Sequence, residues 1–564
     1  MTSRVNHLNK KTGVTYVYES ISYWDKEKKQ ARNKQVCIGK IDPLSGEFVP
    51  SKRLSPAAQA ATNSLGSSLG SSLGSTTLTN VTASAEVIGP SIILDAVTED
   101  LGLSKLLKSC FPSDYEQIMT MAQYLACDGG ALSHCDSWCK SHAPSLASSL
   151  TSQRISEILS SIGVDEKQTF FTKWMKVVAE DDYLCYDITS VSSYSKLNEY
   201  IKYGYNRDKE KLPQLNLAAV FGQKKALPVY FHRLPGNITD VRTLHNLLKT
   251  FKVMETKAGK TEKTEKTEKA GKTEKAGKME KISYVMDKGF YSKQNIDELV
   301  AGGDKFLIAI PLNNKWLHKA IDDVYDTIHS HEGYHKVDDE VLYLHTRLYP
   351  WGDKRHRTYL HLYYNAKARA EAIDQFNEDL LTYKQELESG NTNDKHQSHY
   401  DNFFIIKTTP KRGRKVTYNN EAINKHMKRY KGFQALLSNS IKDPIKALQV
   451  YRDKDVVEKC FDDLKNQLDM KRLRMHNSKT VDGRLFVQFI ALIYMSAIRK
   501  ELRSTKLIEK YTVRELLKEM ETITKISYSG KYRPVITELT KQQQEILAAM
   551  KITPPGCQHP PSKT

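Results

Sequence analysis

The sequence contains little cysteine and no long apolar run. Its eight cysteines are scattered irregularly over 564 residues, which suits a reducing compartment and argues against a disulfide scaffold. The best apolar stretch, 485–498, is interrupted by Gln488 and is shorter than the about 18 residues of a membrane helix. The N-terminus lacks the apolar core of a signal peptide. These absences predict a cytoplasmic location and no membrane contact.

Acidic residues are the minority among the charged ones. The chain has 66 Asp and Glu against 85 Lys and Arg, a formal net charge of +19. Such an excess favours a polyanionic partner, although charge alone does not identify it. Hydrophobic residues make up 39% of the chain, which excludes global disorder. At about 100–200 residues per domain, this length predicts several structural units.

One cluster of metal-binding residue types stands out, and we interpret it as ordinary packing. It comprises His134, Cys135 and Cys139. A zinc site needs a fourth ligand and usually has a second ligand pair at regular spacing. Cys127 is the nearest further cysteine and is a weak complement.

The pattern of composition predicts an α/β fold with helical and β-rich additions. The predicted segments are a basic β unit (1–60), a Ser/Gly linker (61–85), a helical segment that could bind DNA (86–180), the first part of a mixed sheet (181–310) with a Lys-rich low-complexity insertion (256–281), a β-rich insertion (311–440), a helical completion of the core (441–500) and a C-terminal helical region (501–564). The insertion at 256–281 has almost no apolar residue, so it cannot form a packed core.

Two aspartates follow apolar segments in equivalent places. Asp187 follows the apolar segment 183–186, and Asp287 follows 282–286, so we expect each to end a strand. A carboxylate at the C-terminal end of a sheet strand faces a crevice, where α/β folds usually place their chemistry. Two such carboxylates and a third acid could hold a pair of divalent ions about 3.5–4 Å apart.

The third acid is predicted on a helix near residue 458. Tyr451, Lys454, Glu458 and Lys465 are offset by 0, 3, 7 and 14 positions, which places them near one face of a single helix. We expect Glu458 to bind metal and the two lysines to neutralise phosphates. The opposite side of this helix is apolar and is expected to pack on the sheet.

This constellation resembles a known family. Tyr-x2-Arg-x3-Glu-x6-Lys is the signature of DDE transposases of the insertion-sequence four group and their close relatives, and this chain has it with Lys454 in the place of the arginine. Lysine keeps the charge but lacks the planar fork of arginine. The segments 186–190 and 287–291 resemble the first two acidic motifs, and the resemblance covers roughly 180–500.

The resemblance implies an RNase H-like catalytic core that carries a β-rich insertion. It implies that Asp187, Asp287 and Glu458 are the catalytic residues and hold two Mg²⁺ or Mn²⁺ ions, with no other cofactor. The implied activity is that of an endonuclease and strand-transfer enzyme, which cuts at the ends of an insertion sequence through hairpin intermediates. The implied partners are the terminal inverted repeats, target DNA and a second copy of the chain, with nucleoid association.

Several basic and aromatic residues are candidates for DNA contact. The predicted set comprises Tyr451, Lys454, Lys465, Lys471, Arg472, Arg474, Lys411, Arg412 and Arg414. The alternative for the basic residues is that they are ordinary solvated surface residues without a DNA contact. Trp316 and Trp351 could stack on a base flipped out near the cut, and ordinary burial is their alternative.

Two other functions stay open from the sequence. One is a catalytically inactive, transposase-derived protein that still binds DNA, an alternative favoured by the Lys-rich insertion and by Lys454. The other is an RNase H-like nuclease that cuts without joining strands. The presence of all three acids argues against the first, and the spacing from Tyr451 to Lys465 argues against the second.

Overall fold

The chain folds into two compact units, Met1–Val81 and Thr82–Thr564. The computed structural model describes residues 2–9, 14–25, 30–41, 48–50, 82–142, 149–178, 182–195, 198–267, 282–409, 413–427, 430–473, 477–529 and 532–556. Most of the predicted linker, 61–81, lies outside the described residues, as does 268–281 of the Lys-rich insertion.

The first unit is a four-stranded antiparallel sheet. Its strands, in the order β1-β2-β3-β4, are β1 (Thr2–Leu8), β2 (Thr15–Asp25), β3 (Gln30–Ile41) and β4 (Phe48–Pro50). Val17 is buried in β2, and Ile38 is buried in its neighbour β3. The two segments at 14–18 and 21–24 that predicted strands belong to one continuous strand, β2.

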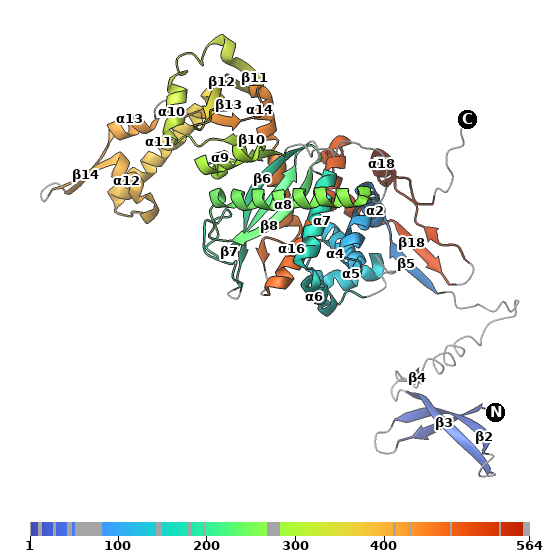
Figure 1. Ribbon diagram of the computed structural model, residues 1–564. Coiled ribbons are helices and arrows are strands. Elements are labelled where there is room, and N and C mark those ends of the chain that lie inside the picture. The colour runs from blue at the N-terminus through green and yellow to red at the C-terminus, as the bar shows by residue number, and fades with distance from the viewer. Residues whose placement is uncertain are drawn as a thin grey trace. The chain divides into compact units, whose positions relative to one another are not determined.

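The second unit begins with a strand and six helices. They are β5 (Ala83–Val87), α2 (Gly89–Asp100), α3 (Leu103–Cys110), α4 (Tyr115–Cys127), α5 (Cys135–His142), α6 (Ser152–Ser161) and α7 (Val164–Val178) (Figure 1). Apolar residues at helical spacing turn one face of each helix inward. Cys135 and Cys139 are among the buried residues, with their sulfur atoms 3.9 Å apart.

A long helix, α16 (Ser478–Ser504), packs mainly against α4 and α6 and also contacts α2. The ring of Phe486 lies 5.1 Å from Phe111 and 5.2 Å from Phe170. Gly483 allows the close approach of α6, because a Cβ there would lie 2.0 Å from the carbonyl oxygen of Leu159. By length and composition α16 is the one described helix that could cross a membrane, and 83% of its apolar window is buried inside the fold.

The second unit also contains a mixed sheet of ten described strands. The central strands run in the order β8-β7-β6-β9-β10, and they are β6 (Tyr183–Ser193), β7 (Gln214–Gly222), β8 (Leu227–Pro235), β9 (Ser283–Met286) and β10 (Lys305–Ala309). The pairs β6–β7 and β7–β8 are antiparallel, whereas β6–β9 and β9–β10 are parallel. Every residue of β7 is buried, so both faces of the sheet are covered.

Helices lie in two of the connections between these strands. Helix α8 (Asp240–Thr267) follows β8 and crosses in front of the sheet in Figure 1, and α9 (Lys293–Gly302) joins β9 to β10. The sequence predicted helix over 241–251, and the structure extends it through 267, into the Lys-rich repeat.

The sheet continues beyond β10 into the segment predicted as an insertion. Its added strands, in the order β11-β12-β13-β16 toward β10, are β11 (Tyr334–Val337), β12 (Glu340–Trp351), β13 (His356–Tyr364) and β16 (Phe433–Ser438). Helix α10 (Lys315–Asp322) precedes them. Between β13 and β16 the chain leaves the sheet and builds a second apolar core.

That second core belongs to a projecting arm (Figure 1). Its elements are α11 (Ala366–Ser389), α12 (Gln397–Phe403), β14 (Phe404–Thr409), β15 (Gly413–Tyr418) and α13 (Asn420–Met427). Phe376 lies 5.1 Å from Phe403, ring centre to ring centre, and both are buried.

The C-terminal region is not wholly helical. After α17 (Val513–Met520), strand β18 (Thr524–Tyr528) pairs with β19 (Val535–Ile536) and with β5, and α18 (Lys541–Ala549) follows. The sequence predicted a helical region here. The partner β5 is more than 400 residues away in the chain, so no local pattern could reveal the pairing.

Candidate active site

Asp187 and Asp287 lie next to each other on adjacent parallel strands. In the register of β6 and β9, Tyr186 pairs with Met286, so each aspartate comes one residue after the last pair. Neighbouring strands are about 4.8 Å apart, and residues in register point to the same face. Asp287 follows the end of β9 as predicted, but Asp187 lies inside β6, which continues to Ser193. The prediction that Asp187 ends its strand is therefore wrong, because β6 goes on pairing with β7.

Asp187 is half-buried and lies among charges of both signs. One of its oxygens accepts a hydrogen bond from the backbone N–H of Ile188 at 2.8 Å. Burial raises the pKa of Asp187 to about 6; the Ile188 bond, Arg207 and Lys454 lower it, and the charge of Asp287 raises it. A buried carboxylate beside a second carboxylate is stabilised by any cation that enters between them.

The helix predicted to carry the third acid is broken in two. Tyr451 is near the end of α14 (Pro444–Arg452), whereas Glu458 lies in α15 (Asp455–Asp462). Lys454 is the residue before α15, and its backbone N–H bonds the carbonyl of Tyr451 in a tight turn. The prediction of one continuous helix face is thus wrong, since the turn at Asp453 changes the angle between the side chains.

The turn nevertheless brings the signature residues to the acids. The Tyr451 hydroxyl donates to Asp287 Oδ1 at 2.7 Å, and Lys454 Nζ donates to Glu458 Oε1 at 3.0 Å. The apolar side of α15 packs on the sheet as predicted, with Val457 and Cys460 buried. Each signature side chain therefore contacts an acid or lies against one.

Lys465 reaches the site through a π-helical turn, Asp463–Gln467, which continues α15. Its Nζ lies 2.8 and 2.7 Å from the two carboxylate oxygens of Asp208. A π turn advances the chain by more residues per turn than an α-helix. Asp463 anchors the turn by an ion pair with Arg499 on α16.

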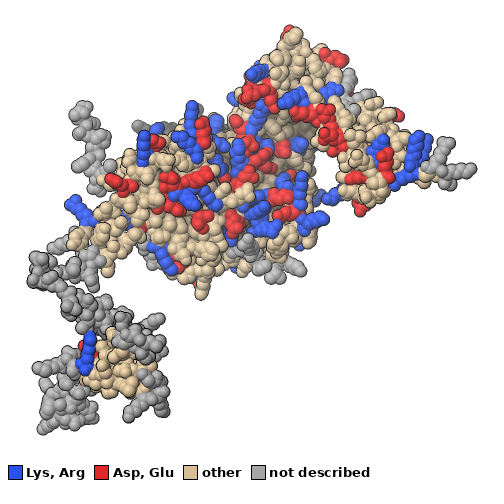
Figure 2. All heavy atoms as spheres, turned by 180° about the vertical axis from the view of Figure 1, so that it is seen from behind, with Lys and Arg blue, Asp and Glu red and all other residues tan. Residues whose placement is uncertain are grey.

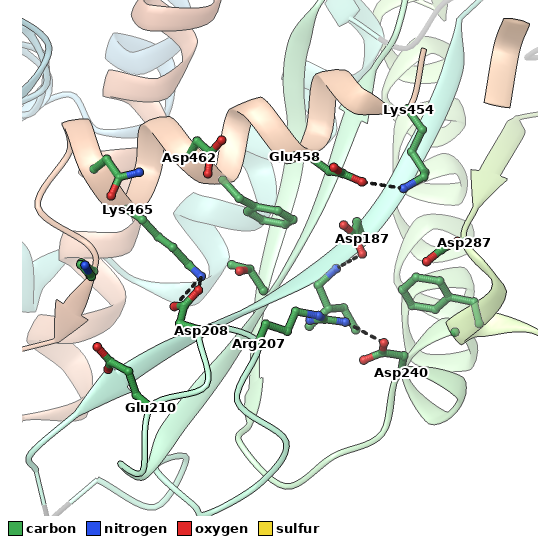
Figure 3. Close-up of a pocket in the computed structure, with 17 residues that line it drawn as sticks. Asp187, Arg207, Asp208, Glu210, Asp240, Asp287, Lys454, Glu458, Asp462 and Lys465 are labelled. Atoms are coloured by element: carbon green, nitrogen blue, oxygen red, sulfur yellow. Dashed lines mark hydrogen bonds and ion pairs between the residues drawn. The ribbon is translucent and has the colours of Figure 1, made fainter. Parts of the chain in front are cut away.

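The three acids, Lys454 and Lys465 line one cavity of about 590 Å³ (Figure 3). Its charged lining consists of seven carboxylates (Asp187, Asp208, Glu210, Asp240, Asp287, Glu458 and Asp462) and four cations (Arg207, Lys454, Lys465 and Lys471). The excess is negative although the whole chain carries +19. On the face of the molecule in Figure 2, acids and bases are interspersed. An acidic cavity needs bound cations before a phosphate can enter it.

Four charged residues of the cavity were missed by the sequence analysis. Arg207, Asp208 and Glu210 come from the connection between β6 and β7, and Asp240 begins α8. Arg207 donates to Asp240 at 2.7 Å, and burial raises the pKa of Asp240 while Arg207 lowers it. The start of α8 after the Pro-Gly-Asn loop was a signal for Asp240, but nothing local pointed to Arg207 or Asp208.

The other predicted DNA-contact residues lie in different places. Lys471 lines the cavity. Arg472, in β17 (Arg472–Leu473), contacts Glu210 at 3.1 Å and donates to the Tyr194 hydroxyl at 2.7 Å. Arg414 is exposed on β15 in the projecting arm and does not line the cavity. Lys411, Arg412 and Arg474 lie outside the described residues.

An aromatic hollow of about 770 Å³ lies further along the sheet. Trp316 and Tyr349 line it with ring centres 4.7 Å apart, and Trp316 donates to the Tyr291 hydroxyl at 2.8 Å. Trp351 is buried and donates to Asp297 at 2.7 Å. A second hollow, of about 960 Å³, shares lining residues with both this one and the acidic cavity.

The geometry of the acids agrees with a family comparison. The model of the transposase DDE domain matches residues 179–494, more than half of the chain. The chain belongs to the DDE transposase family. Members of this family are in general enzymes that cleave DNA and transfer strands, and they generally use divalent metal ions.

Comparisons with individual proteins add little to the family. No curated protein matches this transposase family member. Seven chains of solved structures match. One is a cryo-EM structure of the piggyBac transposase synaptic complex with hairpin DNA, with 8% sequence identity and a TM-score of 0.34 over 77% of each chain.

The three acids fit divalent ions by donor chemistry. Mg²⁺ and Mn²⁺ prefer carboxylate and water oxygens, and Asp187, Asp287 and Glu458 present carboxylates to one cavity with a negative excess. Within the described ranges, no three such groups already stand at metal-binding separation. Lys454 meanwhile holds Glu458, so its ammonium is a partner that a metal ion would replace.

Proposed function

We propose that this chain is a metal-dependent DNA transposase of the insertion-sequence four group. It cleaves DNA at the ends of its element and joins the freed 3′-hydroxyls to target DNA. The observation that carries the proposal is that Asp187, Asp287 and Glu458 line one cavity although they come from three separate elements. The contacts of Tyr451 and Lys454 with two of these acids support the assignment of the signature.

We extend the proposal to an RNase H-like core. Such a core has three antiparallel strands followed by two parallel ones, and the order β8-β7-β6-β9-β10 with its strand directions supports it. The parallel β6–β9 pair then carries the first two acids, and α15 carries the third against the same sheet.

The residues of the cavity would divide the chemistry among them. Asp187, Asp287 and Glu458 would hold two Mg²⁺ or Mn²⁺ ions. Bound there, such ions activate the attacking oxygen and stabilise the leaving 3′-oxygen. Tyr451 orients the Asp287 carboxylate by its hydrogen bond. Lys454 and Lys465 would exchange their carboxylate partners for oxygens of the DNA backbone and so counter the charge of the phosphate.

Attack on phosphorus occurs in line with the leaving oxygen, first by water and then by a 3′-hydroxyl. Because two element ends must be joined together, we propose a homodimer in the synaptic complex, acting on DNA in the nucleoid. The phosphate contacts would position the DNA without selecting its sequence.

Cleavage of a labelled duplex carrying the element end tests the proposal. The experiment compares the wild type with Glu458→Gln in the presence of Mg²⁺. Asp462→Asn is the matched control, because Asp462 lines the same cavity one turn further along α15. We expect nicked and joined products from the wild type and from Asp462→Asn, and at least a thousandfold slower cleavage by Glu458→Gln.

The other outcomes assign a different function or a different acid. Binding of the element end without any metal-dependent product from the wild type would favour the inactive DNA-binding copy. Cutting without a joined product would favour a nuclease. Cleavage that survives Glu458→Gln and fails in Asp462→Asn would move the third metal ligand to Asp462.

Hairpin formation is the finer part of the proposal. It requires a base to leave the stack near the cut, and half-buried Trp316 in the aromatic hollow is the better-placed candidate to receive it, because Trp351 is buried. We expect Trp316→Ala to nick the first strand at the wild-type rate and to lose at least tenfold in hairpin yield. Equal yields from both proteins would remove Trp316 from this role.

A further inference from the structure

The connection between β6 and β7 exposes two aromatic rings to solvent. Tyr203 is 75% exposed and Tyr205 is 85% exposed, the highest values of any large apolar side chain that the structure describes. Single exposed apolar residues are common on folded proteins. Two neighbouring aromatic rings with such large exposed fractions are costly to hydrate, which favours a binding site for a partner that covers them.

The backbone beneath these rings is held firmly. Lys202 and Gln214 exchange two backbone hydrogen bonds of 2.9 Å. The Tyr205 carbonyl accepts a hydrogen bond from the Gln214 side chain at 2.8 Å. Gly204 packs so closely that a Cβ there would lie 2.0 Å from the carbonyl oxygen of Gly236. The backbone that carries the rings is therefore ordered, which reduces the conformational entropy lost when a partner binds.

The same connection forms one wall of the acidic cavity. Arg207, Asp208 and Glu210 line that cavity, and Asp208 binds Lys465 (Figure 3). A chain spans at most about 3.6 Å per residue. The Cα of Tyr205 is therefore within about 7 Å of that of Arg207. The two tyrosines do not line the cavity themselves, so they would meet a DNA strand only where it leaves the cavity on this side.

Cations flank the two aromatic residues along this connection, where Asp208 and Glu210 also lie. Lys202, Lys209 and Lys211 are exposed on the connection itself. Next to it, the Arg472 guanidinium lies 5.5 Å from the ring centre of Tyr194, which is 59% exposed. Basic groups that follow a backbone, combined with aromatic rings on which bases stack, are the features of surfaces that bind single-stranded nucleic acid.

We propose that Tyr203 and Tyr205 form a stacking platform for unpaired bases of the DNA strand that passes the catalytic cavity. The proposal rests on the proposed function and adds to it a place for the strand that opens at the cut. A paired base hides its faces within the duplex, so exposed rings of this kind gain contact only with bases that have left the stack. Stacking of this type tolerates any base, so the platform would act on any flanking sequence.

Affinity for opened DNA tests the platform. The probes are an element-end duplex with four mismatched positions at the cut and the fully paired duplex of the same length, measured without divalent metal. We expect the double variant Tyr203→Ala/Tyr205→Ala to bind the mismatched probe at least tenfold more weakly and the paired probe within about twofold of the wild type. The Tyr203→Phe/Tyr205→Phe variant, which keeps both rings, should bind the mismatched probe as the wild type does.

Tyr532→Ala is the matched control, since Tyr532 is 64% exposed but follows β18 of the three-stranded sheet. Unchanged affinity of the double alanine variant for the mismatched probe would overturn the platform, and so would equal weakening for both probes. A change in oligomeric state on light scattering would also overturn it and assign the rings to an interface between copies.

A cross-link in the wild type provides a measurement that needs no variant. With 5-iodouracil at the mismatched positions, illumination should attach the DNA to the peptide that contains 202–211. Attachment elsewhere overturns the platform while the cleavage assay still tests the proposed function. If the wild type binds neither probe, both proposals fail; if it cleaves element ends but the alanine variant binds like the wild type, only the platform fails.

Discussion

Lys454 is the residue whose charge most directly faces the three acids. Its side chain is only 10% exposed and bonds Glu458. Burial lowers the pKa of Lys454, but the Glu458 bond and the charges of Asp187 and Asp287 outweigh burial and raise it above its ordinary value. The Lys454 ammonium therefore stays protonated, and it lies where negative charge would develop on a phosphate.

We expect Lys454→Met to slow single-turnover cleavage by about 10²–10³-fold, the usual cost of removing one preorganised donor. Binding of the element end should change by less than about threefold, because the site still has its other cations. Lys454→Arg keeps the charge and should restore cleavage to within about tenfold of the wild type. A methionine variant that cuts at the wild-type rate would show that this cation has no part in the chemistry.

His361 on β13 predicts a pH dependence of stability. Its two ring nitrogens lie 2.8 Å from the Thr346 hydroxyl and 3.1 Å from the Ile441 carbonyl, and burial lowers its pKa to about 4. The unfolded chain has an ordinary histidine pKa of about 6.5. Between about pH 6.5 and pH 4 the histidine is protonated in the unfolded state but stays neutral in the folded state. The stability that His361 contributes is therefore complete above about pH 6.5 and is lost as the pH falls toward 4.

Between pH 7 and pH 5 the loss amounts to about 2 kcal/mol. Urea-unfolding midpoints at the two pH values measure it, and His361→Gln removes the titrating group. We expect the difference between the two pH values to be smaller in the variant by about this amount. Equal pH dependence in the two proteins would mean that His361 titrates normally.

At the scale of elements, the sequence indicated which side chains of the α14–α15 segment lie near the acids, but it did not indicate the conformation of the backbone. The spacing from Tyr451 to Lys465 pointed to side chains that the structure brings close to the acids. It could not reveal the turn at Asp453 or the π-helical turn at Asp463, since both depend on tertiary partners. The strands β6, β7, β9 and β10 were predicted because each is a short apolar run, whereas the pairing of β5 with β18 joins distant residues.

The π-helical turn depends on a buried ion pair. The side chain of Asp463 is 5% exposed and that of Arg499 is 23% exposed. Removing one partner of such a pair costs about 3–5 kcal/mol, because the other charge stays buried. We expect Arg499→Met to lower the thermal midpoint of this large unit by roughly 3–5 °C and to slow cleavage through a displaced Lys465.

The double variant Asp463→Leu/Arg499→Met serves as the control for this prediction. It removes both charges, so at least half of the lost midpoint should return. Failure of the double variant to recover would show that the carboxylate holds the π-helical turn by its own contacts.

At the scale of the whole molecule, the boundary at Thr82 separates two compact units. Sequence composition predicted the unit over 1–60 because polar, Ser/Gly-rich residues follow it. The start of the larger unit was harder to predict from the sequence. Strand β5 begins inside the range predicted as linker, 61–85, and ends two residues beyond it. Its pairing with β18 makes β5 part of the larger unit.

Two truncated chains test where the larger unit begins. A chain that starts at Thr82 keeps β5, and we expect its thermal midpoint to lie within about 2 °C of the full-length value. A chain that starts at Gly89 loses the five residue pairs between β5 and β18 and the hydrogen bond from Ile88 to the Ile523 carbonyl. Exposure of the β18 edge should lower its midpoint by several degrees and promote aggregation. Equal midpoints for the two truncated chains would place the start of the stable unit at α2 and leave β5 as an accessory strand.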